Sequence, residues 1–254
     1  MPTPFYHLNT AEDLSRHPKL TGSLARLIRE NMCPFLLGNT APDVQVISAQ
    51  PREDTHFFSL PIQNGMPPAW EHFLVENPKL ANPKLLPSPQ AVFLAGYLCH
   101  LQADWLWIKR IYAPIFSRNC AWETPAYRNY IHNVLRSYLD LQVWDKITSL
   151  YGYCLETVDP SGWLPFVEDR YLCEWRDLLA RQLHPGGSKE TVEVFAARQG
   201  IDPSDFYRLL ESEERMDREV FCYLNRDQLE AFLHDLIAEN LFLLERYFSG
   251  KFTC

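Results

Sequence analysis

The chain has 254 residues, 46% of them hydrophobic and 13% aromatic, which is enough to bury a sizeable core as one large domain or two small ones. Its formal net charge of -8 argues against a broad basic surface, so we expect no nucleic-acid binding and no attraction to anionic membranes. No apolar run reaches the roughly 18 residues of a membrane span, and we expect no transmembrane segment.

Cysteine usage and the first residues both predict a cytoplasmic location. The seven cysteines are scattered and include no Cys-x-x-Cys pair, a pattern that favours reduced thiols over disulfides or a cysteine zinc site. The N-terminal residues have neither the basic nor the apolar region of a secretory signal. We therefore expect a cytoplasmic protein, and its oligomeric state is left open.

Helical periodicity dominates the chain and predicts an all-α fold. Asn9 or Thr10 is the expected N-cap of the first helix, and Ser88 that of a long central helix that Pro114 ends or kinks. Residues 44–47 are the only fair strand candidate, and residues 38–43 and 50–66 are expected to be irregular. The expected helices cover residues 8–18, 22–37, 67–76, 88–114, 125–147, 163–183, 189–199, 203–223 and 226–248.

The loop at Pro185-Gly186-Gly187 is the best candidate for a boundary within the chain. It would separate a helical metal-site domain, residues 1–184, from a C-terminal helical extension, residues 185–254, packed on it. Helices are expected on both sides of the loop, which favours one continuous domain.

His100 and Asp104 lie four residues apart in the apolar run 91–116, so a helix presents both on one buried face. A buried imidazole and carboxylate need partners, and a pair without metal explains these two residues alone equally well. Asp43 and His56 lie upstream in segments expected to be irregular, where functional groups concentrate. Two imidazoles and two carboxylates suit a divalent ion such as zinc.

These residues occur in an order that resembles the zinc-dependent phospholipase C family. The similar segments are Leu37-Gly38-Asn39-Thr40-Ala41-Pro42-Asp43, then Thr55-His56-Phe57, then Gly96-Tyr97-Leu98-Cys99-His100-Leu101-Gln102-Ala103-Asp104. The resemblance covers roughly the first 140 residues. It implies a multi-helix bundle of the phospholipase C type, here with additional C-terminal helices, and a zinc cluster that hydrolyses phosphoesters.

The resemblance also implies roles for individual side chains. Asp43, His56, His100 and Asp104 would hold one zinc ion, and Asp104 would bridge to a second. His7 matches the early histidine of the family, and His132 matches a later metal ligand. Asp43 has an alternative role as general base from the edge of the site. Gly96 lies one helical turn before His100, and we expect a glycine to be needed there because a larger side chain would crowd the metal.

Two arginines mark departures from the family pattern. Arg110 stands where the family has a further histidine, six residues after the aspartate of the central helix, and Arg136 replaces the glutamate of a His-x-x-x-Glu pair that begins at His132. We therefore expect one or two zinc or other divalent ions and not three. Our hypothesis is that Arg136 supplies part of the missing positive charge to a phosphate. Three tightly held ions per chain in a metal analysis would contradict it.

The leading functional hypothesis is a zinc-dependent hydrolase acting on a small-molecule or lipid phosphoester, with metal-activated water attacking phosphorus. One alternative is a metalloenzyme of the same fold that uses the ion as a Lewis acid on a non-phosphate substrate. The other is a non-catalytic helical protein that binds metal or a partner. The other histidines are expected outside the site, with His17, His72 and His184 at the surface and His234 as a packing residue.

Overall fold

The computed structural model describes residues 2–63, 65–118, 120–144, 146–147, 150–187, 190–250 and 252. These residues form helices joined by turns and include no strand, which confirms the all-α fold class. The α-helices are α1 (Pro4–Arg16), α2 (Gly22–Glu30), α3 (Met32–Gly38), α4 (Gln45–Ser48), α5 (Arg52–His56), α6 (Ala69–Glu76), α7 (Ser88–Trp107), α8 (Pro125–Trp144), α9 (Leu150–Glu156), α10 (Asp169–Leu183), α11 (Thr191–Gln199), α12 (Pro203–Leu210), α13 (Glu213–Glu219) and α14 (Arg226–Ser249). Three short 3₁₀ helices, η1 (Ala41–Val44), η2 (Pro78–Leu80) and η3 (Pro83–Leu85), and one π-helix, η4 (Ile108–Phe116), complete the set.

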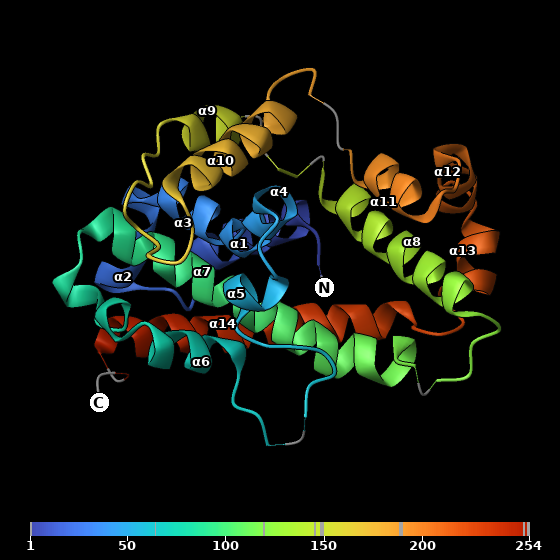
Figure 1. The fold of residues 1–254 in the computed structure, drawn as a ribbon, viewed down its shortest axis with the longest axis horizontal. Helices are drawn as coiled ribbons and strands as arrows, with labels where there is room; N and C mark the ends of the chain where they lie inside the picture. The colour runs from blue at the N-terminus through green and yellow to red at the C-terminus, as the bar shows by residue number, and fades with distance from the viewer. Residues whose placement is uncertain are drawn as a thin grey trace.

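Helix α7 is the central element of the fold, with α14 running beside it (Figure 1). Every residue of α7 from Ala91 to Trp107 is buried, as expected for a helix that is apolar around most of its circumference. It packs against α3, α6 and α14. The side chains that α7 presents to its neighbours are therefore shielded from water on all sides.

Two glycines allow α3 and α7 to approach closely. A Cβ atom on Gly38 would collide with the backbone of Phe93, and one on Gly96 would collide with the carbonyl of Phe35 and lie 2.9 Å from the backbone nitrogen of Asn39. The expectation that Gly96 makes room for a metal was therefore wrong. Its missing side chain makes room for the backbone of α3, which brings Asn39 against α7.

The N-terminal helix begins earlier than expected, because Pro4 occupies its first turn, where a missing N–H costs nothing. Asn9 and Thr10, the expected N-caps, are buried inside this helix. His7 consequently lies on α1 and not before it, and its direction is fixed by helix packing.

Several other boundaries differ from the expected ones. The helix expected over 22–37 is split at Asn31 into α2 and α3, and the one expected over 203–223 is split into α12 and α13. The strand candidate 44–47 is helical, because it belongs to η1 and α4. The central helix passes through Pro114 as the π-helix η4, which ends at Phe116. Helices α5 and α9 were not expected at all.

The last helix lies where it was expected, with Asn225 and Gln228 forming a reciprocal capping box at its start. It packs against α7 and α1, so the C-terminal segment covers the central helix. Arg110 fixes this contact through ion pairs at 2.6 Å with both Asp235 and Glu239 of α14. This pairing accounts for Arg110, the first departure from the family pattern.

Cys33 and Cys154 form a disulfide that ties α3 to α9, with Cα atoms 5.3 Å apart. The expectation of reduced thiols was wrong for this pair, because the fold brings together two cysteines that lie 121 residues apart in the sequence. A disulfide is typical of oxidising compartments, so the cysteines no longer support a cytoplasmic location. Within the described part of the chain, none of the helices combines the length and the apolar character that a membrane span requires.

Candidate metal centre

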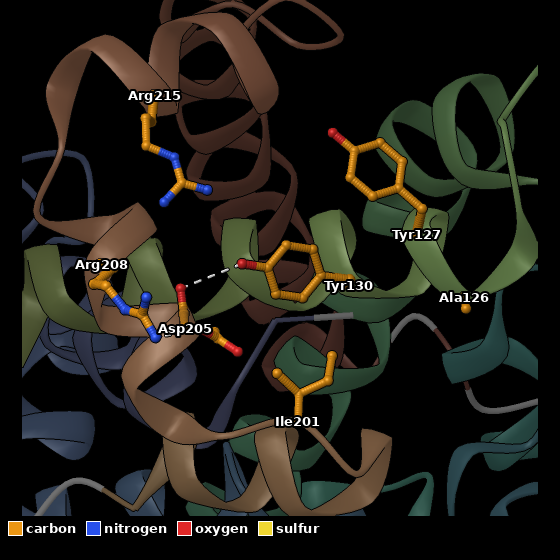
Figure 2. A pocket seen from close by; sticks show the side chains of 7 residues that line it. All are labelled: Ala126, Tyr127, Tyr130, Ile201, Asp205, Arg208 and Arg215. Atoms are coloured by element: carbon orange, nitrogen blue, oxygen red, sulfur yellow. Dashed lines mark hydrogen bonds and ion pairs between the residues drawn. The ribbon is translucent and has the colours of Figure 1, made fainter.

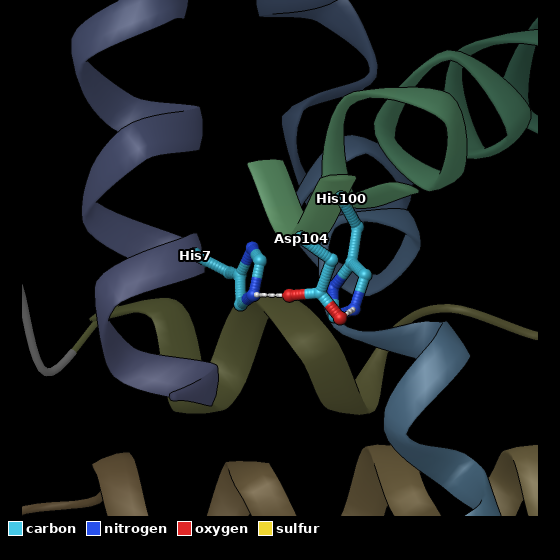
Figure 3. Close-up of side chains that lie close together, drawn as sticks. All are labelled: His7, His100 and Asp104. Carbon is cyan, nitrogen blue, oxygen red and sulfur yellow. Dashed lines mark ion pairs between the residues drawn. The ribbon is translucent and has the colours of Figure 1, made fainter. Parts of the chain in front are cut away.

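Five of the predicted ligands come from four separate elements and meet in the interior. His100 and Asp104 lie one turn apart on α7, His7 on α1, Asp43 on η1 and His56 at the end of α5. Figure 3 shows His7 of α1 facing Asp104 of α7. The rings of His7 and His100 are stacked with their centroids 3.9 Å apart. Four of these side chains are at most 1% exposed, and Asp43 is 16% exposed. We call these five residues the His–Asp cluster.

Asp104 faces all three histidines of the His–Asp cluster. Its Oδ2 lies 3.4 Å from Nε2 of His56 and 3.8 Å from Nε2 of His100, and its Oδ1 lies 3.6 Å from Nε2 of His7. Oδ1 of Asp43 lies 3.5 Å from Nε2 of His56. The two oxygens of Asp104 therefore face different histidines, as a bridging carboxylate would.

These separations are too long for hydrogen bonds, which join nitrogen and oxygen at about 2.7–3.2 Å. The Nε2 atoms of His7, His56 and His100 and the Oδ1 of Asp104 are all buried without a hydrogen-bond partner. A tetrahedral zinc ion with bonds of about 2.0–2.2 Å would hold its ligand atoms about 3.3–3.6 Å apart. The observed separations of 3.4–3.8 Å lie close to that range, so the residues fit a metal ion.

The outer nitrogens of two histidines are held by the protein. Nδ1 of His100 lies 2.8 Å from the carbonyl oxygen of Asn39, which can only accept, so Nδ1 carries the hydrogen and Nε2 keeps its lone pair. The Thr55 hydroxyl donates to the carbonyl of Arg52 at 3.2 Å and therefore accepts from Nδ1 of His56 at 3.0 Å. These two contacts leave the Nε2 lone pairs of His100 and His56 available to the His–Asp cluster, as hydrogen bonds to the outer nitrogen of a histidine do in metal sites.

The protonation states also suit metal ligands. Burial, and then the charge of His7, lowers the pKa of His100 to about 3, so this imidazole is neutral at pH 7. Burial raises the pKa of Asp43, but contact with His56 and the field of His100 outweigh it and hold the value at about 2. Despite burial, His100, His56, His7 and Arg52 keep the pKa of Asp104 well below its usual range. His100 thus offers a neutral nitrogen, and Asp43 and Asp104 offer ionised oxygens.

Sequence reasoning missed two residues that complete the site. Arg52 lies one turn before His56 on α5, and its Nη2 donates to Oδ2 of Asp104 at 2.7 Å. Thr55 is fully buried, and its hydroxyl orients the His56 ring through the contact with Nδ1. The four-residue spacing of Arg52 and His56 could have indicated that both side chains lie on one face. That inference requires residues 52–56 to be helical, and they were expected to be irregular. Directly after His56, Phe57 takes a φ of 59°, a conformation that bulky residues rarely adopt.

The structure does not bring His132 into the His–Asp cluster. It lies on α8 among aromatic rings, and its Nε2 accepts a hydrogen bond from the indole of Trp107 at 3.2 Å. Burial lowers the pKa of His132 well below its usual range, so it is neutral. The Nε2 lone pair of His132 accepts from Trp107, so the buried imidazole is hydrogen-bonded without a metal ion.

Arg136, also on α8, packs on the ring of Phe195 with its guanidinium carbon 4.3 Å from the centroid. Burial lowers the pKa of Arg136 to about 10, and the charges of Asp43 and Asp104 oppose that shift. Its charge is therefore felt by both carboxylates of the His–Asp cluster, although it directly bonds Asn133 at 3.2 Å.

The remaining histidines lie outside the His–Asp cluster. His72 is exposed and pairs with Glu76, and His17 is half-buried. His184 is 22% exposed and bonds Glu156 at 2.8 Å, so it is less of a surface residue than expected. The expected packing role of His234 was wrong, because its side chain is 85% exposed on the outer face of α14.

Two cavities lie outside the His–Asp cluster. One, of about 700 Å³, is lined by residues 60–63, by Trp105 at the end of α7 and by Ile108 and Lys109 of η4, and by none of the five cluster residues. The other, of about 580 Å³, lies between α8 and α12–α13 and is also lined by Ile201 (Figure 2). None of the cluster residues lines it. Its two arginines are already paired, Arg208 with Asp205 at 2.6 Å and Arg215 with Glu219 at 3.0 Å.

Comparison with protein-family models, with curated proteins and with solved structures finds no match to this chain. The resemblance to the zinc-dependent phospholipases C therefore rests on the motif residues, and the argument for function rests on the His–Asp cluster.

Proposed function

We propose that the His–Asp cluster binds one or two divalent ions, zinc foremost, and that the protein is a metal-dependent phosphoester hydrolase. One observation carries the proposal. Three buried Nε2 atoms, of His7, His56 and His100, and the Oδ1 of Asp104 lack hydrogen-bond partners. Ligand atoms of His7, His100 and Asp104 lie within 4.8 Å of one another, and so do those of Asp43, His56 and His100, which is close enough for each group to hold a metal ion. Leaving four such atoms buried and unsatisfied would cost roughly 1–3 kcal/mol each, so a bound cation is the simplest explanation.

The proposed ligands of the first ion are Asp43, His56, His100 and Asp104. The second oxygen of Asp104, together with His7, offers the start of a second site. A bound zinc ion supplies Lewis acidity toward a phosphoryl oxygen and lowers the pKa of a bound water toward about 7. The two carboxylates balance the charge of one ion, and an imidazole that binds a metal does so in its neutral form and adds no charge.

Asp43 fits the role of ligand better than that of general base. A carboxylate with a pKa of about 2 is a weak base at neutral pH, since efficient general bases have pKa values near the working pH. The same low value keeps Asp43 ionised and ready to bind a cation. Its side chain is 16% exposed, the largest exposed fraction of the five cluster residues.

The test combines metal analysis with turnover of phosphodiesters and phosphomonoesters. Wild-type protein loaded with zinc and then desalted should retain one or two ions and hydrolyse at least one phosphoester, and both properties should be lost in His100→Ala. His234→Ala removes an exposed imidazole and is the matched control. A folded His100→Ala variant with full activity would reject the mechanism. A lower zinc content in the His132→Asn variant than in wild-type protein would show that His132 is a ligand.

A non-catalytic metal site is the second candidate, and the depth of burial favours it. Three imidazoles and one carboxylate at most 1% exposed resemble a closed structural site more than an open catalytic one. In that case chelation of the ion should lower the unfolding temperature strongly while a broad phosphoester panel shows no turnover by the loaded protein. Turnover by the zinc-loaded protein that chelation abolishes would exclude this candidate.

A further inference from the structure

The cavity of about 700 Å³ outside the His–Asp cluster is formed by two segments that lie far apart in the sequence. The connection between α5 and α6 contributes Leu60, Ile62 and Met66, and the other segment contributes Trp105 near the end of α7 and residues of the π-helix η4. Most of the side chains that line the cavity are apolar. Its volume lies within the range of about 300–1,000 Å³ that is typical of small-molecule sites, so it can hold a ligand with a sizeable apolar part.

The apolar lining includes both buried and exposed side chains. Trp105 and Ile108 are 4% and 3% exposed, so they form the floor of the cavity. Leu60 also lines the cavity and is 47% exposed, although its side chain is apolar. An apolar ligand lying over the floor would remove the Leu60 side chain from water, which is favourable. The cavity therefore suits an alkyl chain.

Lys109 and Arg118 are the only charged residues among the described residues that line the cavity. Both are exposed, and within the described part of the chain neither forms an ion pair. Arg110, which directly follows Lys109, is by contrast held by Asp235 and Glu239 at 2.6 Å, and the arginines of the 580 Å³ cavity are paired as well. On a chain with a net charge of -8, a cavity lined by two unpaired cations and no carboxylate is set apart from the rest of the surface and attracts anions.

We propose that this cavity binds an amphiphile with one apolar chain and a phosphate monoester head. The chain lies over Trp105 and Ile108, and the head faces Lys109 and Arg118. A phosphate monoester carries close to two negative charges at neutral pH, which matches two cations better than a carboxylate does. The cavity shares no residue with the His–Asp cluster, so the inference does not rest on a bound metal or on the proposed hydrolysis.

Calorimetry with decyl phosphate, kept below its micelle concentration, tests the inference on the full chain. The protein is first treated with a chelator, so that no metal ion can bind the phosphate head. We expect affinity to rise about fourfold with each added methylene from octyl to dodecyl phosphate, the effect of burying one CH₂ group. Decanoate, with one negative charge, and decanol, with none, should both bind more weakly than decyl phosphate.

Variants of the lining test the head and the chain separately. Lys109→Gln and Arg118→Gln should each weaken decyl phosphate binding about fivefold, the upper end of the effect of exposed charge pairs, and about 25-fold together, while decanol binding stays unchanged. Ala113 is an exposed lining residue, and Ala113→Trp should fill the cavity and abolish binding of both ligands. Lys79→Gln removes an exposed lysine that does not line the cavity and is the matched control.

The inference fails if the cations or the cavity prove unnecessary. Unchanged decyl phosphate affinity in the double variant of Lys109 and Arg118 would show that the head does not meet these cations. Unchanged affinity in a folded Ala113→Trp variant would place the ligand elsewhere, and decanoate binding as tight as that of decyl phosphate would rule out the phosphate head. Binding to phosphatidylserine vesicles without binding of monomeric decyl phosphate would show that the two cations attract a membrane surface instead. Turnover of phosphoesters by the metal-loaded protein is measured separately and is unaffected by any of these results.

Discussion

Gly96→Ala should separate the two helices that position His100. The added methyl group would meet backbone atoms of α3, the carbonyl of Phe35 and the nitrogen of Asn39, the latter at 2.9 Å. Backbone atoms cannot rotate out of the way as a side chain can, so α3 and α7 must move apart. Asn39 then moves away from Nδ1 of His100, which it holds at 2.8 Å.

Two opposing effects set the size of the stability change. Replacing glycine with alanine inside a helix gains about 1 kcal/mol in helix propensity. Overpacking a tight contact costs about 1–3 kcal/mol, and an unyielding backbone places Gly96→Ala at the upper end of that range. We expect a net loss of about 2 kcal/mol in the free energy of unfolding. Zinc affinity should fall by about 10- to 100-fold, the usual cost of losing an outer-shell bond to a ligand histidine.

Guanidinium chloride unfolding of the metal-free protein measures the first quantity, and competition with a chelating dye measures the second. Gly152→Ala is the matched control, because its methyl group would lie 2.9 Å from the carbonyl of Ala180 at the contact of α9 with α10, outside the His–Asp cluster. It should lose stability and keep its zinc affinity. A Gly96→Ala protein at least as stable as wild type, with unchanged zinc affinity, would refute the reasoning.

Three further predictions concern protonation, the disulfide and the orientation of His56. The pKa of His100 falls from 6.5 to about 3 on folding, so between these pH values the unfolded chain binds more protons than the folded one. The metal-free protein should therefore lose up to about 1.4 kcal/mol of stability for each pH unit of acidification in that range. Denaturant unfolding from pH 7.5 to pH 4 measures this loss, and an equally steep loss in His100→Asn would contradict it. Replacing Cys33 and Cys154 with serine should lower the free energy of unfolding by up to about 5 kcal/mol, because the bond closes a loop spanning 121 residues. Equal urea midpoints for the variant and the oxidised wild type would argue against that value. Thr55→Val removes the hydroxyl that bonds Nδ1 of His56 and should weaken zinc binding about 10-fold, which unchanged dye competition would disprove.

The central pair of the site was predictable because its geometry is local. His100 and Asp104 belong to one helix, and a four-residue spacing sets their relative direction wherever that helix lies. The apolar run that contains them also predicted their burial. The structure places both on one face of α7 with Nε2 and Oδ2 3.8 Å apart, which confirms the interpretation of this stretch.

Positions that depend on packing between elements were harder to predict. Helix α5 is five residues long, too short to show a periodic apolar pattern, so Arg52 and His56 could not be placed on one face. His132 and Asp104 lie on α8 and α7, with the π-helix η4 between them, and no spacing in the sequence fixes their relative orientation. The disulfide posed the same difficulty, since Cys33 and Cys154 meet only through the packing of α3 on α9.

The charges around the site connect the number of bound ions to the class of substrate. Asp43 and Asp104 together balance one divalent ion, so the ligands and the ion of a one-ion site carry no net charge. Such a site suits a phosphodiester, which carries one negative charge, better than a phosphomonoester, which carries close to two at neutral pH. A second ion bound between Asp104 and His7 would add two positive charges and shift the preference toward the monoester. We therefore expect that protein holding one zinc ion per chain turns over phosphodiesters more efficiently than phosphomonoesters. The opposite order of kcat/KM at that stoichiometry would show that the side chains around the ion do not set the charge of the substrate.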